Sequence, residues 1–413
     1  LAFKYFWFFN KVRNIKISGV GRHFASVFYP LLCSELDRTI FIITPGVNSF
    51  NVFESISGFV DLFSKKIKII YYPEDDSLIY KNINSSVEIS KMRSEAYLKC
   101  LLPGNKIFVT NIDALVEKIP EPTGIKENLV KLKKGGILNL NQILETLNVN
   151  NFERKIKVEN YFEYAVRGSI LDVFPPGTEY PVRIELFGDE INSIRLFSPD
   201  TSTTTKETEE IDLFLFNSGR KSNNEKGCIL DFFSSQKTIV IIDNEDELKR
   251  EIKEKIEKIK KYLDVDIIGE NIFSIKKIYK KLNPYQKIRT SEINGRSQIK
   301  LDVTMNPSFN KDMDLLFDYA EDRILNGHKF YIVSDNEGEE KHLKDFFIQK
   351  EEKEGRRITS LLNFMIADLD RGFVMESAKV TVVSNKEVFE RYSDGYETAK
   401  RKKSFKPLRH ISE

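Results

Sequence analysis

Candidate phosphate-binding residues lie in the turn that follows the first predicted strand. The turn reads Ser18-Gly19-Val20-Gly21-Arg22-His23-Phe24-Ala25-Ser26, at the position where nucleoside triphosphatases place their phosphate-binding loop. Such a loop uses backbone N–H groups, a lysine that reaches the β and γ oxygens, and a hydroxyl that holds Mg²⁺. None of the 20 glycines in the chain is followed by lysine. Gly19, Gly21 and Arg22 therefore predict a vestigial nucleotide loop, in which Arg22 attracts a phosphate or the turn is purely structural.

The carboxylates that would hold magnesium are also poorly placed. The strand predicted over Ile67–Tyr72 is followed by Pro73 before Glu74-Asp75-Asp76, and Asp243, at the end of a later strand, is followed by asparagine rather than glutamate. The four histidines and three cysteines are scattered, without the spacing of a zinc site. We expect no catalytic residue, no metal and no cofactor in this chain.

A second set of candidate residues lies on the predicted strand Val182–Phe187. Alternation places Val182, Ile184 and Leu186 on a core face and Arg183, Glu185 and Phe187 on the other face. Arginine and phenylalanine on one exposed face are typical of protein interfaces. A Gly188-Asp189 turn would fold the strand back onto Glu190–Phe197, although strict pairing fails beyond Ser193, where a bulge or an early strand end is expected.

The preceding stretch, Tyr164–Phe174, is predicted as one strand that brings a further arginine, Arg167, beside Gly168. Glycine in a strand permits close approach of another chain. For each arginine, a contact with a partner protein and a surface ion pair with Glu185 or Asp172 both remain open.

Length and composition limit the class of protein. At roughly 100–200 residues per domain, 413 residues suggest two to four domains. The chain is 41% hydrophobic and 31% charged, with a net charge of only +2, so no global field points to nucleic acid as the ligand. Widely separated cysteines fit a reducing cytoplasm. The uncharged stretch Thr39–Phe53 is interrupted by Pro45-Gly46 and is too short to cross a bilayer, so we expect no membrane span.

Short apolar strands alternate with amphipathic helices over residues 1–118, the pattern of a RecA-like or Rossmann-like α/β domain with a parallel sheet. The predicted strands are Ile15–Ile17, Thr39–Thr44, Ile67–Tyr72 and Ile107–Thr110, and the predicted helices are Phe24–Leu36, Phe50–Phe63 and Val87–Leu101. After Pro120-Glu121-Pro122 the residues become those of strands and turns. We predict an inserted α+β domain over 119–212, closed by an exposed loop at Ser198–Glu210.

The α/β pattern resumes over residues 213–296, with a strand at Thr238–Ile242 and a helix at Leu248–Leu263 whose basic face is either solvated or a DNA contact. A smaller α/β domain is predicted over 297–395 and a basic linker over 396–413. Its predicted elements are the helices Asp314–Leu325 and Glu337–Ile348 and the strands Phe330–Val333 and Val380–Val383.

The stretches 165–176 and 182–191 resemble the signature shared by the excision-repair protein UvrB and the transcription-repair coupling factor family. The resemblance extends upstream to 87–93 and 109–115, and downstream to 372–374, 380–383 and 387–389. UvrB is expected to carry a phosphate-loop lysine, a DNA-clamping hairpin and a second motor domain. The lysine is absent, and the segment between Tyr80 and Met92 is too short for that hairpin. The coupling factor is therefore the better match.

The resemblance implies that the inserted domain recruits the damage-recognition protein UvrA through Arg167, Arg183 and Phe187. It also implies RNA polymerase and DNA as partners of the full-length protein, with ATP and magnesium in an ATP-driven translocase located beyond this chain. Because the chain lacks an initiator methionine, we expect an N-terminal fragment. Two alternatives remain: a UvrB-type ATP-dependent damage-binding enzyme, and a nucleic-acid-binding module acting through Leu248–Leu263 and the basic tail Lys400–Lys406.

Overall fold

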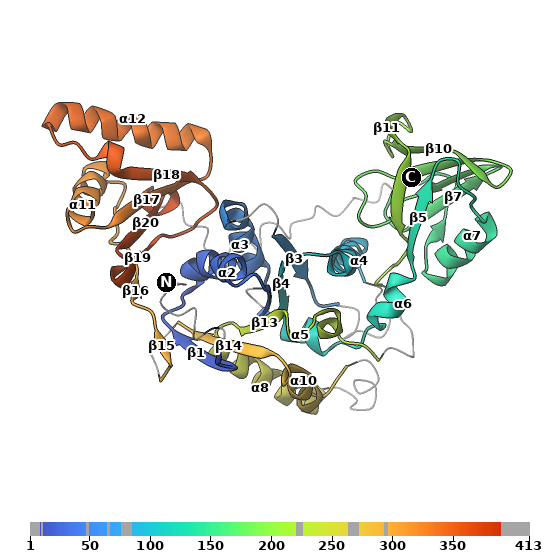
Figure 1. Cartoon of the computed structure of the whole chain (residues 1–413), viewed down its shortest axis with the longest axis horizontal. Helices are drawn as coiled ribbons and strands as arrows, with labels where there is room; N and C mark the ends of the chain where they lie inside the picture. The colour runs from blue at the N-terminus through green and yellow to red at the C-terminus, as the bar shows by residue number, and fades with distance from the viewer. Residues whose placement is uncertain are drawn as a thin grey trace, which may run out of the picture.

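The computed structural model describes residues 9, 11–46, 49–63, 67–75, 85–219, 226–262, 272–292 and 296–389. Figure 1 shows a parallel sheet in the middle of the molecule, with a strand-rich unit on one side and a smaller α/β unit on the other. The basic linker predicted over 396–413 lies outside the described residues, as do residues 81–84 of the segment between Tyr80 and Met92.

Parallel strands form the central sheet, in the order β15-β1-β14-β13-β2-β4-β3. All of the described pairings between them are parallel. Every residue of β2 and β4 is buried, as expected for a sheet covered on both faces. The strands are β1 Asn14–Ser18, β2 Thr39–Thr44, β3 Lys68–Tyr72, β4 Lys106–Asn111, β13 Thr238–Ile242, β14 Gln286–Ser291 and β15 Ile299–Lys300. The predicted α/β fold with a parallel sheet is confirmed.

Helices cover both faces of this sheet, and each face forms its own cluster of buried apolar side chains. One face packs against α2 (Arg22–Leu36) and α3 (Ser49–Phe63). The other packs against α4 (Val87–Leu101), α5 (Ile112–Val116), α8 (Glu245–Tyr262) and α10 (Ile275–Leu282). Ser86 begins α4 by accepting a hydrogen bond from the Ile89 N–H, a common helix cap. The four helices predicted around this sheet are therefore present, with small shifts at their ends.

The strand-rich unit contains a sheet in the order β11-β10-β9-β8-β7-β6 and a two-stranded sheet of β5 with β12. The strands are β5 Leu129–Lys133, β6 Glu153–Arg154, β7 Glu163–Arg167, β8 Ile170–Val173, β9 Val182–Phe187, β10 Glu190–Phe197, β11 Thr204–Thr208 and β12 Glu210–Phe214. The short helices α6 (Pro122–Lys126) and α7 (Leu140–Val149) complete it. A bridge between Ile119 and Gly227 brings together the two connections to the central sheet.

Two predictions about this unit are wrong. The stretch Tyr164–Phe174 is a hairpin of β7 and β8 rather than one strand, because Gly168 adopts a φ of +59° that allows a tight turn. The predicted loop Ser198–Glu210 contains the edge strand β11, whose polar residues pair with β10. Its exposed, threonine-rich sequence resembles a loop because one edge of the strand faces solvent.

The smaller α/β unit has a sheet in the order β16-β19-β20-β17-β18. Its strands are β16 Val303–Thr304, β17 Lys329–Ser334, β18 Leu362–Ile366, β19 Phe373–Met375 and β20 Val380–Ser384, and its helices are α11 Met313–Leu325, α12 Glu337–Glu354 and α13 Asn385–Val388. One face joins the apolar cluster of α2 and α3, where the rings of Phe24 and Phe373 meet edge to face at 5.1 Å. The two units therefore share a continuous core.

The remaining structural predictions concern cysteines, membrane spans and the basic helix. Cys33, Cys100 and Cys228 are free and buried. Within the described residues, no helix has the length and apolar character needed to cross a bilayer. The predicted helix Leu248–Leu263 corresponds to α8, but the side chains beyond Glu254 lie outside the described part of the chain.

Candidate functional site

The register of the strand-rich sheet arranges its outward-facing side chains in rows. Cross-strand partners point to the same face of a sheet. One row holds Ala165, Asp172, Arg183 and Arg195, and the next holds Arg167, Ile170, Glu185 and Ser193. The opposite face carries the buried core, including Val182, Ile184 and Leu186. The predicted separation of these three core residues from Arg183, Glu185 and Phe187 is therefore confirmed.

Asp172 holds two of the predicted site residues together. Its buried carboxylate accepts two hydrogen bonds from Arg183, at 2.7 Å from Nε and 2.8 Å from Nη2, and one from Arg167 Nη2 at 2.9 Å. This two-point geometry fixes the plane of the Arg183 guanidinium. The hydrogen bond and charge of Asp172 raise the pKa of Arg183 above its usual value, against the effect of burial. Both arginines therefore make the ion pair with Asp172 that the sequence left open.

These ion pairs leave the two arginines with different exposure. The side chain of Arg167 is 55% exposed, whereas that of Arg183 is 22% exposed. The guanidinium of Arg183 also stacks over the ring of Phe197, 4.6 Å from its centroid. Arg167 thus offers an open donor group, and Arg183 a fixed one.

A second ion pair lies beside the first, between Glu185 and Arg195. Ser193 donates a hydrogen bond of 2.9 Å to the other oxygen of Glu185. Arg195 reaches this face because the register shifts between Ile191 and Ser193, which makes Asn192 a bulge. For the pairing with β9 the bulge was expected beyond Ser193, and that place is wrong; the register shift beyond Ser193 occurs in the pairing with β11, between Leu196 and Phe197. The earlier shift puts Ile194 in the core and Arg195 outside, a consequence that alternation counted from Glu190 could not reveal.

Phe187 is the apolar member of the set and is 84% exposed. It ends β9 directly before the turn at Gly188, which has a φ of +64° and no atom within 4 Å of the position of a Cβ. A phenyl ring left in water at a turn contributes nothing to the core of its own domain. The structure brings Arg167, Arg183 and Phe187 onto one face of one sheet.

The turn predicted as a vestigial nucleotide loop contrasts with this face because the protein's own backbone packs against it. Gly19 has a φ of +83°, and a Cβ on it would lie 2.2 Å from the carbonyl oxygen of Leu301. The N–H groups of Gly19 and Val20 donate to the Ser291 carbonyl at 2.9 and 3.2 Å. These are the groups that would cradle a phosphate. They are already used in holding the loop to the end of β14.

A carboxylate lies near the start of α2. An oxygen of Glu292 lies 3.4 Å from the position that a Cβ of Gly21 would take. Negative charge is favourable near a helix N-terminus. Arg22 begins the helix, and its side chain lies outside the described part of the structure.

Asp243, the carboxylate at the end of β13, is surrounded by hydroxyl donors. It accepts hydrogen bonds from Tyr29 at 2.5 Å, from Thr44 at 3.1 Å and from Thr290 at 3.1 Å. Burial raises the pKa of Tyr29 well above its usual value, and the charge of Asp243 adds to the effect. Asp243 thus links α2, β2 and β14.

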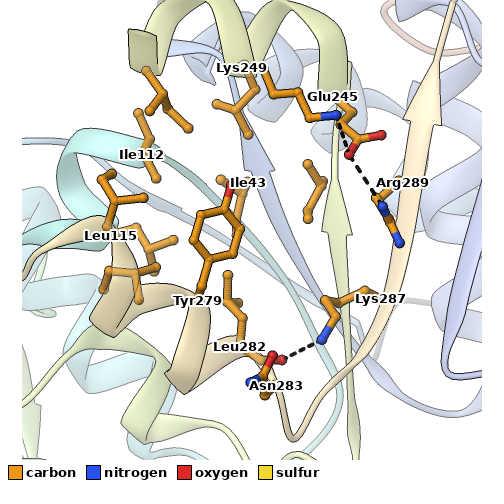
Figure 2. A pocket seen from close by; sticks show the side chains of 15 residues that line it. Ile43, Ile112, Leu115, Glu245, Lys249, Tyr279, Leu282, Asn283, Lys287 and Arg289 are labelled. Carbon is orange, nitrogen blue, oxygen red and sulfur yellow. Dashed lines mark hydrogen bonds and ion pairs between the residues drawn. The ribbon is translucent and has the colours of Figure 1, made fainter. Parts of the chain in front are cut away.

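A pocket of about 240 Å³ lies between α5, α8 and α10, on the face of the central sheet that is opposite to α2 and α3 (Figure 2). Its walls are apolar, and its charged rim contains Glu245, Lys249, Lys287 and Arg289. Glu245 pairs with Lys249 at 2.9 Å and with Arg289 at 3.5 Å, and Lys287 donates to the Leu282 carbonyl at 3.0 Å. The rim charges are therefore largely engaged with the protein itself. No group in the pocket is arranged for proton transfer or nucleophilic attack.

Comparison with known proteins places a family match on the strand-rich unit. The UvrB interaction domain matches residues 130–216, which span β5 to β12. This match contains Arg167, Arg183 and Phe187 together with their partners Asp172, Glu185 and Arg195.

Curated relatives extend the similarity beyond that unit. A transcription-repair-coupling factor of Borreliella burgdorferi is 25% identical over 374 residues, which cover 79% of this chain and 32% of that protein. One of Haemophilus influenzae is 32% identical over 145 residues, covering 35% of this chain and 13% of the relative. UvrABC system protein B of Herpetosiphon aurantiacus is 29% identical over 160 residues, or 39% of this chain and 23% of that protein. The resemblance to transcription-repair coupling factors is confirmed, and the matches span a third or less of the relatives' length.

Proposed function

We propose that this chain is a non-catalytic adaptor module of a transcription-repair coupling factor, and that it recruits UvrA to stalled RNA polymerase. The observation that carries the proposal is the face formed by Arg167, Arg183 and Phe187 within the matched UvrB interaction domain. Asp172 fixes Arg183 through two hydrogen bonds and accepts one from Arg167, and the phenylalanine is open to solvent. A fixed arginine on the same face as an exposed aromatic ring forms an anchor that loses little entropy on binding.

We further propose how this chain is divided into domains and what the rest of the protein binds, with the similarity to transcription-repair-coupling factors as support. We place a degenerate RecA-like domain at 1–118 and 213–296, the UvrA-binding domain between them at 119–212, and a third domain at 297–395. RNA polymerase, DNA, ATP and magnesium would be bound by domains that follow this chain in the full-length protein. A cytoplasmic location fits these partners.

The chain itself would not hydrolyse ATP. Support comes from the missing lysine, the Leu301 carbonyl over Gly19, and the hydroxyl groups that surround Asp243. The UvrB relatives favour the alternative of an ATP-dependent damage-binding enzyme. ATP hydrolysis by the purified chain, abolished in Arg22→Ala, would favour that alternative and contradict our proposal.

The direct test is the affinity of the purified chain for purified UvrA, measured by calorimetry. Arg183→Ala and Phe187→Ala should each weaken binding by about thirtyfold, as for central interface residues. Lys131→Ala is the matched control, because this exposed side chain lies on β5 in the same domain and pairs only with Asp212 among the described residues. If both site variants are folded and bind UvrA as tightly as the control, the proposal is wrong.

A further inference from the structure

Ile137 lies on the same face as Phe187, although 50 positions separate the two residues in the chain. Phe187 pairs with Glu190 across the hairpin, and Glu190 also forms a bridge with Ile137 on its other side. Because bridged residues point to one face, the three side chains form a row at the tip of the sheet. This row lies on the same face as the two rows that contain Arg183 and Arg167. Ile137 is 77% exposed.

Backbone hydrogen bonds fix Ile137 in this row. Gly135 N–H donates to the Ile191 carbonyl, Ile191 N–H donates to the Gly136 carbonyl, and Leu138 N–H donates to the Asp189 carbonyl, each at 2.8 Å. The next residue, Leu138, is buried in the core of the domain. Alternation therefore directs Ile137 outward, and the three bonds hold it there without any contribution from its own side chain.

The opposite end of the same face is closed. Ala165 and Phe197 are buried in a small cluster with Val158 and Phe174, against which Tyr161 packs. Tyr161 in turn lies under Lys91 of α4, 4.5 Å from ring centroid to Nζ. A partner that reaches the arginines therefore finds free surface toward the tip row and not toward α4.

We propose that Ile137 is a second apolar contact of the UvrA-docking face, acting together with Phe187 across Glu190. This inference rests on the proposed function. The complementary surface of UvrA would be an apolar strip that covers both side chains, with a basic group opposite Glu190 and carboxylates opposite Arg167 and Arg183. Continuity with the arginine rows favours UvrA as the occupant over a second copy of this chain, whose tip would bring Glu190 against its own like charge.

The test compares Ile137→Ser with Ile156→Ser. Ile156 is 93% exposed and lies in the same domain, between two lysines and away from the tip row. Calorimetric titration with purified UvrA should show about tenfold weaker binding for Ile137→Ser and no change for Ile156→Ser. Glu190→Lys should also weaken binding, because it reverses the charge between the two apolar residues. Unchanged thermal unfolding would exclude a folding defect.

The outcomes separate the two proposals. If Phe187→Ala weakens binding while Ile137→Ser and Glu190→Lys behave like the Ile156 control, the further inference is wrong and the proposed function stands. If Phe187→Ala and Arg183→Ala also leave binding unchanged, the proposed function is wrong. Self-association of the unaltered chain that is lost in Ile137→Ser, measured by light scattering, would assign the tip row to a second copy and overturn the inference.

Discussion

The glycine turn of the central sheet and the arginine face of the strand-rich sheet both gather polar groups at positions where proteins bind ligands, yet only the second is open. At the turn, the backbone of Leu301 packs against Gly19, the carboxylate of Glu292 lies near Gly21, and the Ser291 carbonyl accepts the N–H groups of Gly19 and Val20. On the sheet, Asp172 pairs with the arginines from within the face, and Arg167 and Phe187 remain exposed to solvent. Internal pairing therefore does not by itself distinguish a closed position from an open one. What distinguishes them is whether the chain also occupies the volume that a ligand would need.

The largest expected effect is on stability, and it should differ between two glycines that both have a positive φ. Gly19→Ala should lower the free energy of unfolding by about 3 kcal/mol or more, because the new Cβ meets the Leu301 carbonyl in a left-handed backbone conformation. Gly188→Ala, in the open turn, should lower it by only about 1 kcal/mol, because the new Cβ meets no other atom and only the left-handed backbone conformation is unfavourable. Urea unfolding of both variants measures the difference. Equal losses would show that the nucleotide turn is not closed by its own chain.

A smaller effect is expected when Asp172 is removed. Asp172→Ala leaves Arg183, mostly buried, without its partner, so the free energy of unfolding should fall by about 1–2 kcal/mol. UvrA affinity should fall by about tenfold or more, because both arginines lose their fixed orientation. Asp212→Ala, which removes an exposed carboxylate from the same domain, is the control. Full UvrA affinity in a folded Asp172→Ala variant would contradict the positioning role of Asp172.

The buried phenol of Tyr29 makes the closed region sensitive to alkali. Its pKa is raised by burial and by Asp243, so its contribution to stability is complete below pH 10 and is lost as pH rises toward the raised pKa of the folded state. Tyr29→Phe should cost about 1 kcal/mol at pH 7 through the lost hydrogen bond to Asp243. Above pH 10 this difference should shrink. A difference that grows with pH in chemical unfolding would exclude the raised pKa.

The smallest effect is expected for the second ion pair. Arg195→Ala removes a partly exposed partner of Glu185 and should change the free energy of unfolding by less than about 1 kcal/mol. It should lower UvrA affinity less than Arg183→Ala does, because Arg195 lies one strand farther from Arg167. If Arg195→Ala lowered UvrA affinity more than Arg183→Ala does, the centre of the proposed docking face would lie closer to β10 than we infer.

Local sequence predicted much of the molecule. Short apolar runs that alternate with amphipathic helices predicted the parallel sheet, because a strand that is buried on both faces has to be apolar along its whole length. Alternation along β9 put Arg183 and Phe187 on one face. The absence of lysine after every glycine argued against a working phosphate loop, since that chemistry needs the residue itself. These conclusions depend on neighbours within a few positions.

Tertiary structure decided what depends on distant residues. The bulge at Asn192 carries Arg195 onto the arginine face, and the turn at Gly168 divides a predicted single strand so that Asp172 lies between two arginines. Leu301, far along the chain from Gly19, packs its carbonyl against the glycine turn. Ile137 joins Phe187 only through a bridge to Glu190. Register and long-range packing have no local sequence signal, because they are set by the sum of contacts across the folded domain.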